Sequence, residues 1–366
     1  MEFSQNRTVS TKQLKNALKY CIRAKRPAFI TGAPGLGKSD VVAQLCTEFG
    51  GRLYDLRVSQ IEQTDIRGMP YYDKESNTMK WAAPIDLPSE EEASRYPIVF
   101  LFLDEMNSAA PSVQGACYQL ILNRRVGTYV LPDNCVIIAA GNRDSDRGIA
   151  YKMPTPLANR FVHFELRVDF DSWNEWANDN RIHRDVVGFL NWSKNSLNDF
   201  DPKSPSKSFA TPRSWEFVSQ LLDDDQVDSG TETDVICGTI GEGLGLKFLS
   251  HRKHASKLPT PQSILNGTVT ELKTKEISIM YSLITSLNYE LKEMWDKLGG
   301  KKDEDKWHAA ADNMLAFILD NMSIEIQVMG MRMALQQFNL PFTPKKLTNF
   351  KRFHDTCGKL VLKAAA

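Results

Sequence analysis

Short apolar runs alternate with amphipathic stretches along the first 166 residues of the chain. Runs that are apolar at nearly every position are typical of strands in a parallel sheet buried on both faces. They cover residues 27–31, 98–103 and 134–140, with more polar strands expected at 53–58 and 162–166. Apolar residues with helical spacing cover 11–25, 40–49 and 111–122. This alternation predicts an α/β fold with a mostly parallel sheet.

From about residue 169 onward the pattern is helical. Residues 211–222 (TPRSWEFVSQLL) open a helix with Pro212 near its first turn. Residues 277–298 place apolar side chains at two positions of a seven-residue repeat, which predicts a long helix packed along a narrow seam. Two more helices are expected at 306–320 and 324–338. The chain is therefore expected to divide into a core, a helical lid and a helical C-terminal extension: residues 1–167, 168–257 and 258–366.

Two hairpins are expected within the core. Residues 68–81 have two β-prone arms around the polar tip 74–77. Residues 125–130 and 134–140 are expected to be two strands joined through Leu131-Pro132-Asp133, which gives a second hairpin over about 125–140.

Composition excludes several classes of protein. The chain has 366 residues, of which 42% are hydrophobic, which is enough for two or three domains. Its 45 basic and 45 acidic residues cancel, so no overall basic excess points to nucleic acid, although a local patch stays open. Six scattered cysteines form no C-x-x-C pair and indicate reduced thiols. Without a signal-peptide stretch or a long apolar run, we expect a cytoplasmic protein with no membrane insertion.

A glycine-rich segment follows the first predicted strand. Residues 32–39 read GAPGLGKS and match the phosphate-binding pattern G-x-x-x-x-G-K-[ST]. Its glycines let backbone N–H groups point at phosphate oxygens. Lys38 can reach the β- and γ-phosphates, and the Ser39 hydroxyl can bind Mg²⁺. The residues expected to bind nucleotide are Gly32, Ala33, Pro34, Gly35, Leu36, Gly37, Lys38, Ser39 and Asp40.

A second predicted strand ends in two adjacent carboxylates. Residues 98–105 read IVFLFLDE. Active sites of parallel sheets lie at the C-terminal ends of the strands, which is where these acids fall. Asp104 is the candidate ligand of Mg²⁺, and Glu105 is the candidate base that orients and deprotonates the attacking water. The two motifs together predict an ATPase that uses ATP and Mg²⁺.

The order of these parts resembles that of the AAA+ ATPases, and within them the MoxR-type branch of the helix-2-insert group. Residues 104–121 (DEMNSAAPSVQGACYQLI) resemble the acidic motif of that branch and the helix after it. The hairpin at 68–81 stands where those proteins have the helix-2 insert, and residues 126–142 where they have the hairpin before the first sensor. Residues 154–161 (PTPLANRF) are similar to the arginine-finger segment. The resemblance covers about residues 10–215 and implies a P-loop AAA+ core.

The resemblance adds three catalytic residues to Lys38 and Glu105. Asn142 matches the first sensor, an amide that helps to place the attacking water. Arg160 matches the finger that reaches into the site of a neighbouring subunit, and Arg213 matches the second sensor on the lid. The arginines that could take the finger role instead are Arg124, Arg125 and Arg143.

The resemblance also implies partners. A finger acting between subunits requires a homo-oligomer, expected here to be a hexameric ring. MoxR-type proteins are chaperone-like remodellers of a protein client, often together with a partner that bears a von Willebrand A domain. Aromatic residues of the two hairpins could contact the client or pack the hairpins together: Tyr71, Tyr72, Trp81 and Tyr129.

Two other functions stay open at this point. Some relatives with the same insert act on DNA, and basic residues would support a nucleic-acid motor: Lys247, His251, Arg252, Lys253, His254, Lys257, Lys345, Lys346, Lys351 and Arg352. A scaffold that binds ATP and hardly hydrolyses it is the third hypothesis, and the presence of Glu105 and Arg160 disfavours it. A metal site at His251 and His254 is disfavoured because no matching ligand pair stands nearby.

Overall fold

The structure is a computed structural model, and it describes residues 7–143, 145–146, 151, 153–223, 228–255, 258–273, 276–298 and 304–358. Side chains are described for all of these except 254, 255 and 298. The chain forms two compact units, residues 1–172 with 200–204, and residues 173–199 with 205–366. The expected C-terminal extension falls within the second unit together with most of the expected lid, of which residues 168–172 and 200–204 belong to the first unit.

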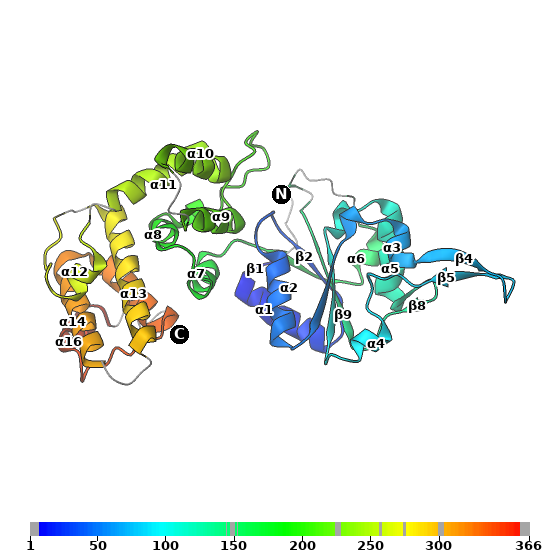
Figure 1. Ribbon diagram of the computed structural model, residues 1–366, viewed down its shortest axis with the longest axis horizontal. Coiled ribbons are helices and arrows are strands. Elements are labelled where there is room, and N and C mark those ends of the chain that lie inside the picture. Colours follow the sequence, from blue (N-terminus) through cyan, green and yellow to red (C-terminus); the bar gives the residue numbers. More distant parts are fainter. Residues whose placement is uncertain are drawn as a thin grey trace. The chain divides into compact units, whose positions relative to one another are not determined.

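A six-stranded parallel sheet forms the centre of the first unit (Figure 1). In spatial order its strands are β1 (Thr8–Val9), β10 (Val162–Leu166), β2 (Ala28–Thr31), β9 (Cys135–Gly141), β6 (Val99–Asp104) and β3 (Arg52–Arg57). Every neighbouring pair is parallel, which confirms the prediction of a mostly parallel sheet followed by helices. Because the strands run in one direction, the C-terminal ends of β2, β9 and β6 meet at one edge.

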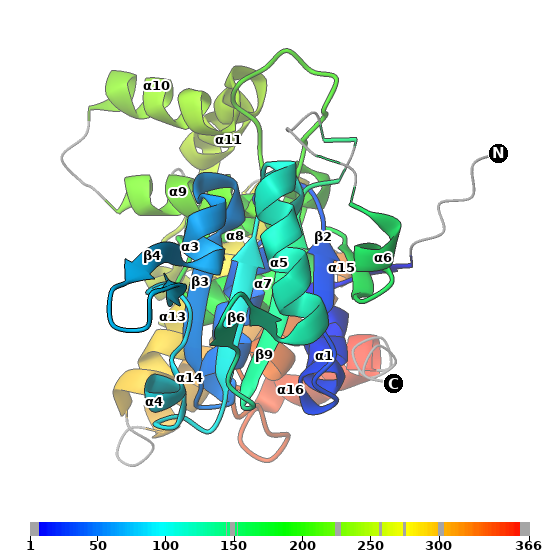
Figure 2. The same cartoon turned by 90° about the vertical axis from the view of Figure 1, so that its right-hand side faces the viewer.

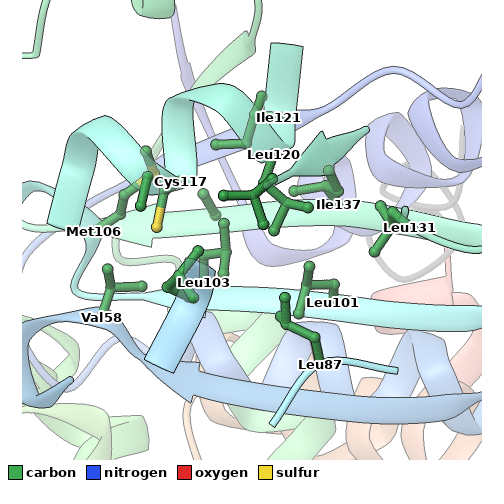
Figure 3. Close-up of a cluster of buried hydrophobic side chains, with 14 of the residues drawn as sticks. Val58, Leu87, Leu101, Leu103, Met106, Cys117, Leu120, Ile121, Leu131 and Ile137 are labelled. Atoms are coloured by element: carbon green, nitrogen blue, oxygen red, sulfur yellow. The ribbon is translucent and has the colours of Figure 1, made fainter. Parts of the chain in front are cut away.

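Helices cover both faces of this sheet (Figure 2). They are α1 (Thr11–Arg23), α2 (Lys38–Glu48), α3 (Gln63–Arg67), α4 (Glu90–Ala93), α5 (Pro111–Asn123) and α6 (Thr155–Ala158), with short 3₁₀ turns η1 (Val58–Gln60) and η2 (Met106–Ser108). Phe100 and Phe102 of β6 pack in a core with α1 and α2. Leu101 and Leu103, the alternate residues, pack against α5 on the opposite face (Figure 3). The strand is apolar throughout because both of its faces are buried.

The N-terminus of α1 is stabilised by a capping box. The Ser10 hydroxyl accepts a hydrogen bond from the Gln13 N–H (3.3 Å), and the Gln13 side chain accepts one from the Ser10 N–H (3.0 Å). We expect Ser10→Ala to cost about 1 kcal/mol and to lower the melting temperature by roughly 2–4 °C. Thermal unfolding monitored by circular dichroism checks this. The control is Asn16→Ala on the exposed side of the same helix, which should be neutral or slightly stabilising because Ala is the better helix former. Equal melting temperatures for the two variants would contradict the cap.

The hairpin expected at 68–81 is present. It consists of the antiparallel strands β4 (Met69–Asp73) and β5 (Thr78–Ala82), which project from the first unit (Figure 1). Gly68 at its base has φ +86°, and a Cβ there would overlap the carbonyl oxygen of Ala82. The Arg67 guanidinium lies 4.5 Å from the centre of the Trp81 ring. The base of the hairpin is therefore packed tightly.

The prediction of one hairpin over about 125–140 is wrong in its strand pairing. β7 (Arg125–Val126) pairs with β8 (Tyr129–Val130) across a turn that contains Gly127, whose φ is +57°. β9 lies instead in the central sheet, between β2 and β6. All seven residues of β9 are buried, and a strand apolar on both faces is stabilised inside a sheet rather than in a surface ribbon.

The second unit is helical. Its helices are α7 (Phe170–Asp179, which begins in the first unit), α8 (Arg184–Trp192), α9 (Pro212–Leu222), α10 (Ser229–Ile240), α11 (Glu242–Ala255), α12 (Pro261–Leu265), α13 (Ile277–Leu298), α14 (Glu304–Asn321), α15 (Ile324–Arg332) and α16 (Thr348–Phe353), with the 3₁₀ turn η3 (Lys194–Leu197) and the π-helical turns η4 (Met333–Gln337) and η5 (His354–Gly358). α13 packs on α8, α11, α12, α14 and α15. In the part of the chain that the structure describes, no helix is both long and apolar enough to span a bilayer.

The long helix at 277–298 is confirmed, but its buried surface is wider than a narrow seam. Thr285 and Asn288, which lie outside the repeat, are fully buried, whereas Ile277 within it is exposed. Gly188 of α8 allows a close approach, since a Cβ there would lie 2.7 Å from the Ser282 hydroxyl oxygen. Contacts with α8, α11, α12, α14 and α15 leave α13 little solvent-facing surface, which a two-position repeat does not predict.

Candidate active site

The glycine-rich loop joins β2 to α2 at the C-terminal edge of the sheet. Gly35 and Gly37 have φ values of +74° and +76°, which side chains rarely tolerate, and Gly37 caps α2. The Lys38 ammonium donates to the carbonyl oxygens of Gly32 (2.8 Å) and Ala33 (3.1 Å), so it lies over the loop. The rest of the predicted set, Pro34, Leu36 and Asp40, lies in this loop and in the first turn of α2.

The loop is joined to the end of β6 by one hydrogen bond. The Ser39 hydroxyl donates to Oδ2 of Asp104 at 3.0 Å, although the two residues lie 65 positions apart. Oδ1 of Asp104 accepts the main-chain N–H of Glu105 at 2.9 Å. The two predicted metal ligands therefore lie side by side, as the sequence predicts for a shared cation.

Glu105 sits in a strained turn. Its φ is +53°, a left-handed conformation that is uncommon for residues other than glycine and that clusters at active sites. The Ser59 hydroxyl, in η1 after the neighbouring strand β3, donates to the Glu105 carboxylate. This contact fixes the direction of the predicted catalytic base.

Asp55 on β3 is a third carboxylate near the site, beside Asp104 and Glu105. Partial burial, and then the charge of Asp104, raise the pKa of Asp55 above its usual value. Sequence reasoning missed both Asp55 and Ser59. The rule that sites form at the C-terminal ends of parallel strands could have identified Ser59, because it follows β3 in the same way that Glu105 follows β6.

Asn142 follows β9 directly and is held through its main chain. Its N–H donates to the side-chain oxygen of Asn107 (3.1 Å), and its carbonyl accepts from the side-chain nitrogen of Asn107 (2.7 Å). The side-chain amide of Asn142 has no hydrogen bond to any residue that the structure describes. β9 and β6 are neighbours, so the predicted sensor and the acidic turn lie at adjacent strand ends.

The structure distinguishes among the candidate finger arginines. Arg143 is bound by Asp146 (3.1 Å) and lies 3.7 Å from Glu165. Arg124 donates to the carbonyl oxygens of Pro132 (2.6 Å) and Cys135 (2.9 Å). The two that stay exposed, without a side-chain bond to any described residue, are Arg125 and Arg160. Arg160 follows α6 and precedes β10.

Arg213 belongs to the second unit. It lies in the first turn of α9, which the Thr211 hydroxyl caps by accepting the Ser214 N–H at 3.1 Å. A cation at this end opposes the helix dipole, so the position favours a nearby anion. Its predicted role as second sensor stays a prediction.

The four hairpin aromatics divide into two groups. Tyr71 and Tyr72 are 48% and 55% exposed on the β4–β5 hairpin. Trp81 packs under Arg67, and Tyr129 is buried with its hydroxyl donating to the Pro88 carbonyl oxygen at 2.7 Å. Of these four aromatics, the two tyrosines of β4 are therefore the ones open to a partner.

Several of the basic residues proposed for nucleic acid have internal contacts. Arg252 pairs with Asp185 (2.8 Å) and Glu232, Lys346 with Glu304 (2.8 Å), and Arg352 with Asp320 (2.5 Å). Lys247 lies over the Trp192 ring at 4.9 Å. Lys257 lies outside the described residues. These contacts reduce the positive charge that the set could offer to a phosphate backbone.

The buried His251 stacks on Trp192, with ring centres 5.4 Å apart. Within the described ranges, no three histidine, cysteine or acidic side chains cluster as metal ligands do. The side chain of His254 lies outside the part of the chain that the structure describes, so a metal site at His251 and His254 stays a hypothesis.

Comparison with protein families gives a match over the part of the chain that contains this site. The model of the family described as "ATPase family associated with various cellular activities (AAA)" matches residues 28–168. Midasin from Giardia intestinalis is 28% identical over 165 residues, which amount to 42% of this chain and 3% of midasin. The match thus concerns a small part of that protein.

Solved structures show weaker likeness. A mutant of RuvB from Thermotoga maritima is 16% identical with a TM-score of 0.38, covering 70% of this chain and 75% of RuvB. NtrX from Brucella abortus in complex with ADP is 13% identical with a TM-score of 0.37, covering 95% of this chain and 68% of NtrX. Scores this low do not bear on function.

Proposed function

We propose that this chain, in which residues 28–168 form an AAA ATPase domain, hydrolyses ATP at the site between the glycine-rich loop and the acidic turn. The observation that supports this most directly is the 3.0 Å hydrogen bond between Ser39 and Asp104. It joins a phosphate-binding loop to a carboxylate pair, which is the combination that phosphoryl transfer requires.

The residues present fit a nucleotide with Mg²⁺. The N-terminus of α2 and the N–H groups of the loop form an anion-binding site, and Lys38 adds a positive charge. The Ser39 hydroxyl and the Asp104 carboxylate are hard oxygen ligands of the kind that Mg²⁺ prefers. When bound, Mg²⁺ neutralises charge on the β- and γ-phosphate oxygens.

Each residue then has one task in the reaction. Glu105 accepts the proton of the attacking water and orients it, with its carboxylate held by Ser59. Asn142 helps to place that water from the end of β9. Lys38 stabilises the negative charge that develops on the γ-phosphoryl oxygens.

We propose that the functional form is a ring of identical subunits, six in number by the MoxR-type resemblance. Arg160 is exposed and has no internal partner among the described residues, as a finger directed to a neighbouring copy requires. The second-sensor role that the resemblance gives Arg213 would add a further positive charge near the γ-phosphate. A ring in which each subunit supplies an arginine to the next is a heterologous, closed interface.

The proposed client is a protein, remodelled in a chaperone-like way, with a von Willebrand A domain protein as the co-partner implied by the resemblance. The exposed Tyr71 and Tyr72 on the β4–β5 hairpin support a protein contact. A DNA motor is the alternative, and the exposed Lys345 and Lys351 are what supports it.

The experiment is a measurement of phosphate release by the purified chain with ATP and Mg²⁺, with and without EDTA. We expect turnover that EDTA abolishes, and none in Lys38→Ala. ATP binding without turnover would favour the nucleotide-gated scaffold. Adding DNA separates the remaining hypotheses: stimulation of turnover together with a salt-dependent DNA affinity would favour the motor over the protein remodeller.

A further inference from the structure

Asn107 is a buried polar residue that has no task in the hydrolysis described so far. It lies in η2, two residues after Glu105, and the residue is only 6% exposed. Burying an amide is costly unless its donor and acceptor atoms are bonded. Both are bonded, and both bonds go to the main chain of Asn142, 35 residues away.

These two hydrogen bonds resemble those that a neighbouring strand would make with the main chain of Asn142. The Asn107 amide accepts the Asn142 N–H and donates to the Asn142 carbonyl, as a neighbouring peptide group would in a sheet. The regular pairing of β6 with β9 ends at Leu103 and Ala139. Asn107 therefore fixes the main chain just beyond the last regular pair, at the point where the Asn142 side chain leaves it.

Gly141 shows that the contact is close. A Cβ at Gly141 would overlap the side-chain oxygen of Asn107. Any other residue at 141 would push Asn107 away from Asn142. The main-chain carbonyl of Asn107 also accepts the Tyr151 N–H at 2.6 Å, so the turn is held from two sides.

We propose that Asn107 is a positioning residue for hydrolysis: it holds the Asn142 main chain so that the Asn142 amide is placed relative to Glu105 and the attacking water. The proposal rests on the proposed ATPase function and on the sensor role of Asn142. Because Asn107 and Glu105 belong to the same short turn, one rigid segment sets the positions of both the base and the sensor.

The test is a double-mutant cycle on kcat in the full chain with Mg²⁺ and ATP, using Asn107→Ala, Asn142→Ala and the double variant. We expect Asn107→Ala to lower kcat by up to about 100-fold, the effect of misplacing a catalytic group, with unchanged affinity for a fluorescent ADP analogue. In the double variant, kcat should equal that of Asn142→Ala within about two-fold, because the amide that Asn107 positions is then already gone.

Asn134→Ala is the matched control. Asn134 also bonds main-chain carbonyls, those of Ala93 (2.8 Å) and Tyr96 (3.0 Å), but it lies at the opposite end of β9. It should lower the melting temperature and leave kcat unchanged. If Asn107→Ala does not fold, Asn107→Asp takes its place in the cycle, since it keeps the shape of the side chain and replaces the donor to the Asn142 carbonyl with a negatively charged carboxylate oxygen.

Three results would overturn the proposal. One is a wild-type kcat in the Asn107 variant. Another is that the Asn107 substitution lowers kcat by the same factor in the wild-type background and in the Asn142→Ala background, which indicates a merely structural role. The third is a wild-type kcat in Asn142→Ala, which removes the sensor itself. Failure of the ATPase function is distinguishable from these, because the unmutated chain would then release no phosphate.

Discussion

A Glu105→Gln variant is expected to bind ATP with unchanged affinity and to hydrolyse it about 10²- to 10⁴-fold more slowly. Gln has nearly the shape of Glu and can still accept the hydrogen bond from Ser59, but it cannot take a proton from water. The loss should therefore appear in kcat and not in nucleotide affinity. Single-turnover phosphate release and equilibrium binding of a fluorescent ATP analogue measure the two quantities separately.

The control for this variant is Glu91→Gln, which changes an exposed glutamate of the same unit that pairs with Arg95 on the surface. It should hydrolyse ATP at the wild-type rate. Glu105→Gln, which binds ATP without hydrolysing it, is also the best variant for isolating a client by pull-down. A client that binds the ATP-loaded protein should remain bound when ATP is not hydrolysed. Normal turnover by Glu105→Gln would show that another group is the base.

An Arg160→Ala variant is expected to keep ATP binding and to lose hydrolysis by about 10³- to 10⁵-fold, the range found for arginine fingers. The guanidinium is exposed and has no partner among the residues that the structure describes, so its removal should cost little stability. Arg160→Lys should be nearly as inactive, because an ammonium lacks the planar fork that binds two phosphoryl oxygens. The control is Arg125→Ala, the other exposed candidate.

A mixing experiment tests whether the arginine acts between subunits. Glu105→Gln and Arg160→Ala are each inactive alone, but a mixed ring contains interfaces with an intact Glu105 on one copy and an intact Arg160 on the next. Random assembly of an equal mixture gives about a quarter of such interfaces, so activity should reappear on mixing. If mixing restores nothing although native mass spectrometry shows mixed rings, Arg160 does not act in trans.

The local parts of the fold and site could be predicted from sequence. β6 is apolar at nearly every position because both faces are buried, and a run of this kind is visible without a structure. The glycines at 35 and 37 have the positive φ values that the loop motif requires. Such features depend on residues within a few positions of one another.

The parts that could not be predicted depend on contacts between distant segments. Asn107 and Ser59 bind groups 35 and 46 residues away, and nothing next to them in the chain marks that pairing. β9 was expected to pair with the segment that precedes it, but burial on both faces places it in the sheet. The wide buried surface of α13 likewise depends on the five α-helices that pack against it.

The tight base of the β4–β5 hairpin has a mechanical consequence. Gly68 lies against the Ala82 carbonyl and Arg67 stacks on Trp81, and these two contacts restrict bending where the hairpin leaves the domain. We expect a force on the tip of the hairpin to rotate β4 and β5 together with α3 as one body. Since α3 begins three residues after η1, only a short stretch of chain separates this moving part from Ser59, whose hydroxyl holds Glu105.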